Sequence, residues 1–328
     1  MTNGLKLPEK KIFIQRRGAE MEKNSRICII GHKGMLGHAI WDLLEKKGYT
    51  NLIGCDLPEV DLCNHSSIVN FFEANRPDYI FFLAAVAAGI EYKKSHPADM
   101  LQKNLQMIAN TFECIHNFEV KKTLNICSAL IYPKDAPIPL TEKDATYVDV
   151  GLIDTPYALA KVAGLQLSLY YKEQYGDDII TAVPCNFFGP FAPFEGDRAG
   201  VVPSLVARIT KATEEKIPQV EVWGTGNACR DLLNVNDVAD ACVFLMENET
   251  KHEFVNIGRG CEYTIKEIAE TIKKVTGYQG ELFFNADRPE GRAHMMMNNE
   301  RLASMGWEPK MNLEESIRNT YEWYVNNR

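Results

Sequence analysis

The sequence predicts an α/β fold in which a doubly wound parallel sheet is accompanied by a smaller C-terminal domain. Two observations lead to this prediction. In the first half of the chain, short apolar segments alternate with segments of helical periodicity, and the apolar segments show no polar alternation. Strands of that kind are covered on both faces, as in parallel sheets, and repeated strand–helix–strand units form right-handed crossovers.

The expected elements follow one another in a regular order. The strands are expected at 26–30, 51–56, 79–85, 123–128 and 179–184, and the helices at 35–48, 65–75, 97–118 and 156–175. After about residue 186 the pattern changes to loops rich in Gly and Pro, a helix at VVPSLVARIT, and the short strands VEVWG and ELFF. We interpret 186–328 as mainly a smaller domain, with some segments returning to the sheet of 25–185.

Composition excludes several classes of function. The chain has 328 residues, 45% of them hydrophobic and 24% charged, and a net charge of -8, which argues against nucleic-acid binding. Its nine cysteines are scattered, with no CxxC pair, which favours reduced thiols over a disulfide framework or a metal site. No segment approaches the roughly 20 apolar residues of a membrane helix. We therefore expect a cytoplasmic protein without a metal.

Residues 1–24 differ in character from the rest of the chain. The first part, MTNGLKLPEKKIFIQRRGAE, is charged and has no apolar region of the export-signal type. Met21 lies just before the first expected strand. We interpret 1–24 as an extension that is disordered or non-native, with Met21 as a candidate natural start.

A glycine-rich turn joins the first strand to the first helix. GHKGMLG (31–37) places glycines where the backbone can approach a pyrophosphate at a helix N-terminus. The turn, its βαβ context and an acid about 20 residues further on predict a Rossmann-type dinucleotide site. The small residues that end the third strand would lie against the same cofactor. The candidate cofactor-binding residues are Gly31, Lys33, Gly34, Met35, Leu36, Gly37, Asp56, Leu83, Ala84, Ala85 and Lys161.

Two side chains bear on the choice between NAD(H) and NADP(H). Asp56 ends the second strand, where a carboxylate hydrogen-bonds the adenosine ribose and repels a 2′-phosphate. Lys33, inside the glycine turn, could instead pair with that phosphate. Asp56 favours NAD(H), and NADP(H) is the alternative.

A catalytic arrangement follows in the second half of the predicted sheet. Tyr157 and Lys161 in TPYALAKVAG are four residues apart and share a helix face. A neighbouring ammonium and the positive charge of the cofactor would lower the tyrosine pKa, so that it can exchange a proton with a carbonyl oxygen as hydride moves. Ser128, at the end of the fourth strand, would hydrogen-bond the same oxygen.

Together these motifs resemble the GDP-L-fucose synthase family of extended short-chain dehydrogenases. The similarity runs from about residue 26 to about 324 and includes ICSALIYPK, TPYALAKVAGLQL, NFFGPF, VWGTGNACRDLLNVNDVADA and FVNIGRGCEYTIKEIAETI. The family epimerises a GDP-4-keto-6-deoxymannose at C3 and C5 and then reduces C4 with NADPH. The resemblance implies Ser128, Tyr157 and Lys161 as the reductase triad. It further implies a GDP-sugar substrate bound by Asn186, Arg208, Trp223 and Arg230.

The sequence departs from the family pattern at the epimerisation positions. A family cysteine that exchanges protons is replaced by Leu130, and a family histidine is replaced by Gly200. Strand parity predicts that Cys127 faces away from Leu130. Glu195 and Asp197 are the possible substitutes. Besides these, Asp56 is unusual for an NADPH family, and a basic pair near the substrate pocket is replaced by His294 and Met295.

Four functions are compatible with these residues. The leading interpretation is a nucleotide-sugar C4 reductase acting on a 4-keto-6-deoxyhexose or heptose without C3/C5 inversion. The alternatives are a 4-dehydrogenase working in the oxidative direction, a bifunctional epimerase/reductase, and a non-catalytic dinucleotide sensor. We also expect a homodimer.

Overall fold

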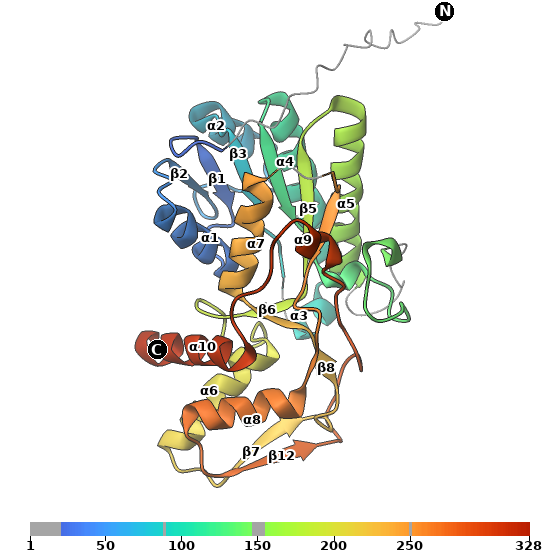
Figure 1. Ribbon diagram of the computed structural model, residues 1–328. Coiled ribbons are helices and arrows are strands. Elements are labelled where there is room, and N and C mark those ends of the chain that lie inside the picture. The colour runs from blue at the N-terminus through green and yellow to red at the C-terminus, as the bar shows by residue number, and fades with distance from the viewer. Residues whose placement is uncertain (1–20, 88–89, 146–154, 249–250) are drawn as a thin grey trace, which may run out of the picture.

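The computed structural model describes residues 21–87, 90–145, 155–248 and 251–328, arranged as two lobes (Figure 1). The larger lobe is built on a six-stranded sheet in the order β10-β5-β4-β3-β1-β2, and every pairing in it is parallel. Its strands are β1 (Ile27–Ile30), β2 (Leu52–Cys55), β3 (Tyr79–Phe82), β4 (Lys122–Ile126), β5 (Ile179–Pro184) and β10 (Phe254–Ile257). The predicted α/β class with a parallel doubly wound sheet is confirmed.

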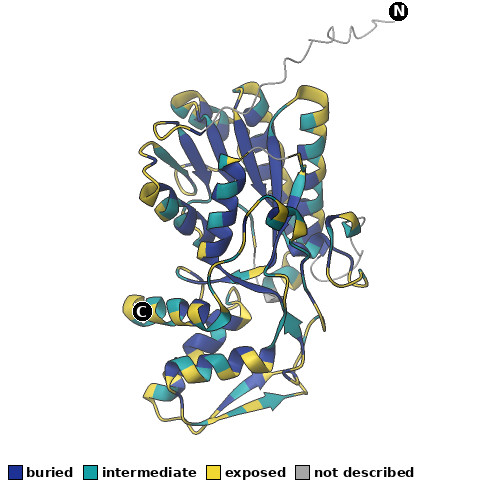
Figure 2. Cartoon of the chain, in the orientation of Figure 1, coloured by how far each residue is buried: buried dark blue, intermediate teal, exposed yellow. Residues whose placement is uncertain are grey.

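Helices cover both faces of this sheet. One face carries α1 (Met35–Lys46) and α7 (Val235–Glu247), and the other carries α2 (His65–Asn75), α4 (Pro97–Asn117) and α5 (Thr155–Tyr175). Side chains of β1 alternate between two buried clusters, Ile27 and Ile29 in one, Cys28 and Ile30 in the other. The central strands are dark blue along their length in Figure 2, which accounts for their unbroken apolar sequence.

The smaller lobe has its own buried core. It contains α6 (Val201–Glu214), α8 (Ile265–Thr276) and α10 (Leu313–Asn327), together with the parallel pair β7 (Gln219–Trp223) and β12 (Glu281–Asn285). Two further short pairs, β6 (Asn186–Phe188) with β9 (Leu232–Asn234) and β8 (Cys229–Arg230) with β11 (Tyr263–Thr264), lie between the lobes or beside the smaller one. After residue 186, α7, β10 and the short α9 (Glu300–Ser304) belong to the larger lobe.

The structure differs from the expected elements at a few points. A short helix, α3 (Ile90–Ser95), was not expected, and β4 ends at Ile126, two residues earlier than expected. Residues 1–20 of the expected extension lie outside the described residues. Met21 is only 4% exposed and its carbonyl accepts a hydrogen bond from the Tyr49 hydroxyl, so the fold begins earlier than residue 25. No helix in the described ranges is long and apolar enough to cross a membrane.

The strand order places a ligand-binding crevice at one edge of the sheet. The chain runs from β1 to β2 on one side and then crosses to β3 on the other side of β1. Ligands of open α/β sheets bind at such a switch point, beyond the carboxyl ends of the strands.

Candidate active site

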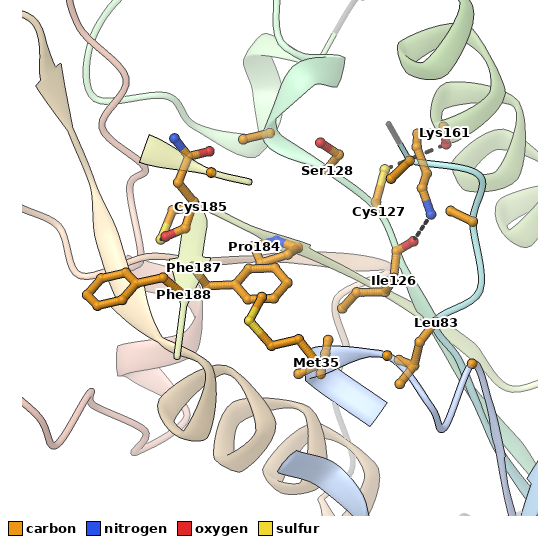
Figure 3. A pocket seen from close by; sticks show the side chains of 18 of the residues that line it. Met35, Leu83, Ile126, Cys127, Ser128, Lys161, Pro184, Cys185, Phe187 and Phe188 are labelled. Carbon is orange, nitrogen blue, oxygen red and sulfur yellow. Dashed lines mark hydrogen bonds between the residues drawn. The ribbon is translucent and has the colours of Figure 1, made fainter. Parts of the chain in front are cut away.

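A cavity of about 540 Å³ opens at the carboxyl ends of the central strands, between the two lobes (Figure 3). This volume lies within the range of small-molecule and cofactor sites. The lining comes from the glycine turn, the ends of β3, β4 and β5, the start of α5 and the start of α6. It comprises Gly31, Gly34, Met35, Leu36, Gly37, Leu83, Ala85, Ala87, Ile126, Cys127, Ser128, Ala129, Tyr157, Lys161, Pro184, Cys185, Asn186, Phe187, Phe188, Gly200, Val201, Val202, Pro203 and Leu232.

The glycine turn is shaped as a dinucleotide cradle. Gly31 has φ +93°, and a Cβ atom there would lie 3.0 Å from the backbone nitrogen of Ala84. A Cβ atom on Gly37 would lie 2.3 Å from the Gly31 carbonyl oxygen, so only glycine fits. Gly34 caps α1 without any side-chain hydrogen bond, which leaves the N–H groups of the first turn for an anion. These residues fit the pyrophosphate of a dinucleotide.

Asp56 and Lys33, the two residues that bear on the choice of cofactor, are each held by hydrogen bonds near the end of β2. The Asp56 carboxylate accepts the backbone N–H of Leu57 at 2.9 Å and that of Lys33 at 3.3 Å. The Lys33 ammonium lies 2.8 Å from the Glu59 carboxylate and 2.8 Å from the Leu57 carbonyl oxygen. Asp56 is therefore fixed at the position where a ribose is expected, and Lys33 pairs with a second acid, Glu59, which was not among the predicted residues.

The structure brings the three predicted catalytic residues to one wall of the cavity. Ser128 follows β4 and its Oγ accepts the N–H of Leu130 at 3.3 Å, at the start of a short 3-10 turn. The Lys161 ammonium lies 5.7 Å from the centre of the Tyr157 ring and donates to the Ile126 carbonyl oxygen at 2.9 Å. Figure 3 shows this bond as a dashed line. Lysine has three N–H donors, so the remaining two can reach a cofactor hydroxyl.

In the protein without cofactor, burial shifts the pKa values of Tyr157 and Lys161. It raises the pKa of Tyr157 above its usual value and lowers the pKa of Lys161. The lowering expected from Lys161 and the positive charge of the cofactor concerns the cofactor-bound enzyme. In the protein alone, desolvation of the phenolate raises the pKa of Tyr157, and the charge of Cys127 adds to the effect. The neutral phenol is the form that can donate a proton.

The two positions of the missing epimerisation groups lie near the same cavity. Gly200 borders it and precedes α6, whereas Leu130 is half-buried and packs against the main core. Cys127 borders the cavity just after the end of β4 at Ile126, so strand parity does not fix its direction relative to Leu130. Its thiol lies 3.6 Å from the Lys161 carbonyl oxygen, and burial raises the pKa of Cys127 to about 11.

The other predicted residues divide into two groups. Asn186 borders the cavity, whereas Arg208, Trp223 and Arg230 lie in the smaller lobe and are not part of the lining. Arg208 donates to the Glu221 carbonyl oxygen, and Arg230 donates to the carbonyl oxygens of Cys229 at 2.6 Å and Arg292 at 2.7 Å.

Trp223 is 51% exposed, with the Arg288 guanidinium 5.3 Å from its ring centre. The candidate substitutes Glu195 and Asp197 are exposed, and Asp197 accepts the N–H of Tyr92 at 3.3 Å.

The part of the cavity wall at the end of β5 was not predicted from the sequence. Pro184, Cys185 and Phe187, which come from the end of β5 and the start of β6, border the cavity (Figure 3). Their signal was their position directly after the fifth strand, since every parallel strand ends at the same edge of the sheet. Burial raises the pKa of Cys185 well above its usual range, with the charge of Asp231 adding to the effect.

Comparisons with known proteins agree with this geometry. Residues 27–258 match the NAD dependent epimerase/dehydratase family. The chain belongs to this family. It is 38% identical over 307 residues to the Putative GDP-L-fucose synthase 2 of Arabidopsis thaliana, with 94% of each chain covered. The predicted resemblance and the predicted class, an NAD(P)-dependent oxidoreductase, are confirmed.

Two solved structures from Campylobacter jejuni are similar over nearly the whole chain. A GDP-6-OMe-4-keto-L-xylo-heptose reductase has a TM-score of 0.88 at 30% identity, covering 94% of this chain and 100% of that one. A GDP-mannoheptose C4 reductase with NADP bound has a TM-score of 0.84 at 32% identity, covering 93% and 99%. Solved structures similar to this chain thus include enzymes named as reductases.

Proposed function

We propose that this family member reduces the C4 carbonyl of a GDP-linked 4-keto-6-deoxyhexose or heptose and leaves C3 and C5 unchanged. The observation that carries the proposal is the combination of an intact Ser128–Tyr157–Lys161 wall with Leu130 and Gly200 at the positions where the family exchanges C–H protons. Neither a leucine side chain nor a glycine can hold a proton. The GDP-heptose reductases that the chain resembles support the reductive direction and the substrate class.

Each residue of the wall has a defined task in this reaction. A bound nicotinamide would supply the hydride for C4. Tyr157, kept neutral by burial, donates its phenolic proton to the C4 oxygen, and Ser128 donates a hydrogen bond to the same oxygen. Lys161 is held by the Ile126 carbonyl so that its other N–H groups position the cofactor beside Tyr157.

The thiols at the cavity do not replace the missing epimerisation groups. Removing a C–H proton next to a ketone requires a base, and a thiol acts as one only when ionised. Burial raises the pKa of both Cys127 and Cys185, so both stay protonated at neutral pH. Cys127 is also turned toward the Lys161 carbonyl.

We further propose NAD(H) as the favoured cofactor and a homodimer as the working state in the cytoplasm. Asp56, fixed by two backbone N–H groups, supports the cofactor preference, whereas the similar C4 reductase was solved with NADP. Exposed apolar side chains on α4 and α5, among them Leu105, Leu159 and Tyr170, support association of two copies. The nine free cysteines fit a reducing compartment. Light scattering of the purified protein measures the number of subunits.

Asp56 also favours one alternative. A preference for NAD⁺ would suit a nucleotide-sugar 4-dehydrogenase, because Tyr157 can accept the hydroxyl proton in the reverse reaction. Supplying the alcohol with NAD⁺ tests this direction.

The deciding experiment measures reduction at C4 and proton exchange at C3 and C5 in the same reaction. The protein is incubated in deuterated water with GDP-4-keto-6-deoxymannose or with its heptose analogue, using NADH or NADPH, and the product is read by NMR. We expect reduction at C4 with no enzyme-dependent deuterium at C3 or C5. Rapid deuterium entry at either carbon would refute the absence of epimerisation, and no turnover of any 4-keto sugar would refute the reductase.

A further inference from the structure

Three backbone segments of the smaller lobe run side by side next to Arg230. β8 pairs with β11 in antiparallel register, with Thr264 opposite Cys229. On its other edge, the N–H of Cys229 donates to the Ala293 carbonyl at 2.7 Å and that of Asp231 donates to the Met295 carbonyl at 3.1 Å. Residues far apart in sequence are therefore held in fixed positions by main-chain hydrogen bonds.

One side chain from each segment meets at a common point. The Cys229 thiol, a carboxylate oxygen of Glu262 and a ring nitrogen of His294 all lie within 4.8 Å of one another. His294 Nδ1 is 2.9 Å from one Glu262 oxygen, and the N–H of Met295 donates to the other at 2.6 Å. The carboxylate, with a side chain only 14% exposed, is thus fixed before any ligand arrives, while His294 closes the cluster from the solvent side.

The charges around the thiol favour a cation. Burial raises the pKa of Cys229, and the negative charges of Glu262 and Glu267 raise it further, while Arg230 opposes them. A positive ion among these groups would remove the repulsion that keeps the thiol protonated. Thiolate, imidazole and one carboxylate oxygen together form a donor set that suits Zn²⁺ and its probe Co²⁺ better than Mg²⁺ or Ca²⁺.

We propose that Cys229, Glu262 and His294 form a three-ligand site for a divalent transition metal, Zn²⁺ foremost, with a fourth position open to water. On binding, the metal would take the place of the Cys229 thiol proton, which passes to solvent, and His294 would bind as a neutral imidazole that keeps its one proton on the other ring nitrogen. None of the three residues borders the 540 Å³ cavity, so the metal would join the segment around His294 to β8 and β11 rather than take part in hydride transfer. The scattered cysteines in the sequence had predicted no metal site, because the three ligands come together only through the strand pairing.

The test is a metal titration of the full chain after treatment with a chelator. We expect one Co²⁺ to bind per chain with the charge-transfer absorption of a cobalt–thiolate bond, and Zn²⁺ to displace it. Cys229→Ser should abolish that band, and Glu262→Gln and His294→Ala should weaken binding by roughly tenfold or more. Saturating Zn²⁺ should raise the unfolding temperature of the wild type by a few degrees, and the same Zn²⁺ concentration should raise that of the variants less.

Two comparisons keep the outcome unambiguous. Cys261→Ser removes an exposed thiol next to Glu262 that lies outside the cluster, and it should bind Co²⁺ like the wild type. If Cys229→Ser does not fold, His294→Ala changes an exposed side chain and still decides the question. Absence of saturable Co²⁺ binding at micromolar protein, or a band lost in Cys261→Ser and kept in Cys229→Ser, would overturn the proposal. The result is independent of whether the protein reduces a 4-keto sugar.

Discussion

Replacing Asp56 with asparagine tests the proposed preference for NAD(H). One carboxylate oxygen accepts the backbone N–H of Leu57 and the other accepts that of Lys33, so asparagine loses the negative charge and can keep only one of these two bonds. Its carbonyl oxygen can still accept a hydrogen bond from a ribose hydroxyl. The substitution therefore removes the charge together with one backbone hydrogen bond.

The size of the effect follows from two contributions. A hydrogen bond to a charged acceptor contributes about 1.5–3 kcal/mol, and a neutral amide at a half-exposed position retains part of it, so NADH should lose about 1 kcal/mol. Loss of the repulsion between Asp56 and a 2′-phosphate should favour NADPH by about 1–3 kcal/mol at an effective dielectric above 20. The ratio of NADPH to NADH affinity should then shift roughly 30- to 900-fold toward NADPH.

A second variant separates the acid from the base. Glu59→Gln leaves Asp56 in place and releases the Lys33 ammonium from its 2.8 Å ion pair. Since an exposed pair of this kind is weak, NADPH should bind up to about fivefold more tightly and NADH should bind equally.

Fluorescence titration of each variant with both cofactors gives the four affinities. A wild type that strongly prefers NADPH, together with an unchanged ratio in Asp56→Asn, would refute the role assigned to Asp56.

Four further variants test the rest of the site. Tyr157→Phe should reduce turnover by about 10²–10⁴ while substrate binding stays nearly normal, and near-normal turnover would remove Tyr157 as the proton donor. Because burial raises the pKa of Tyr157, wild-type reduction should be constant through neutral pH and fall only in strong alkali, whereas the reverse oxidation, which needs the phenolate, should rise with pH. Gly37→Ala places a Cβ atom 2.3 Å from the Gly31 carbonyl oxygen and must displace the turn, so kcat/KM should fall roughly 10²-fold. Gly200→Ala is the control. The atom nearest to its Cβ would be 3.7 Å away, so this variant should keep the cofactor affinity of the wild type. If Arg230 binds the diphosphate, Arg230→Ala should raise the substrate KM roughly 10–150-fold. A loss of thermal stability with unchanged KM would instead show that Arg230 is structural, through its hydrogen bonds to the carbonyl oxygens of Cys229 and Arg292.

The fold was predictable because its signals are local and repeated. The helix expected at 65–75 is α2 with the same bounds, since Asn64 caps it through a bond from the N–H of Ser67 and the pattern ends at Asn75. β5 likewise occupies the expected 179–184, because it is buried on both faces along its whole length. Tyr157 and Lys161 could also be predicted from local sequence. Residues four apart on one helix lie on the same face, so their separation does not depend on tertiary structure.

Other features of the site depend on tertiary structure. Strand parity cannot place Cys127, because β4 ends one residue earlier, at Ile126. The direction of the Tyr157 pKa depends on how deeply the phenol is buried, which no local pattern shows. Cys229, Glu262 and His294 are far apart in sequence, and only the alignment of three short backbone segments brings them together.

The loss of the epimerisation groups is not a requirement of this fold, and this can be tested by restoring them. Gly200 has φ -70° and ψ 167°, which any residue adopts, and the nearest atom to a Cβ there is 3.7 Å away. Leu130 is half-buried, so a smaller cysteine can take its place. Leu130→Cys with Gly200→His should therefore fold, and it should show measurable deuterium exchange at C3 or C5 of a 4-keto sugar where the wild type shows none. C4 reduction needs one proton donor at oxygen, which Tyr157 provides, whereas each inversion needs a base at carbon, so the double variant should add exchange without reducing turnover at C4. A double variant that folds and reduces C4 but exchanges no faster than the wild type would show that positions 130 and 200 do not face C3 and C5 in this protein.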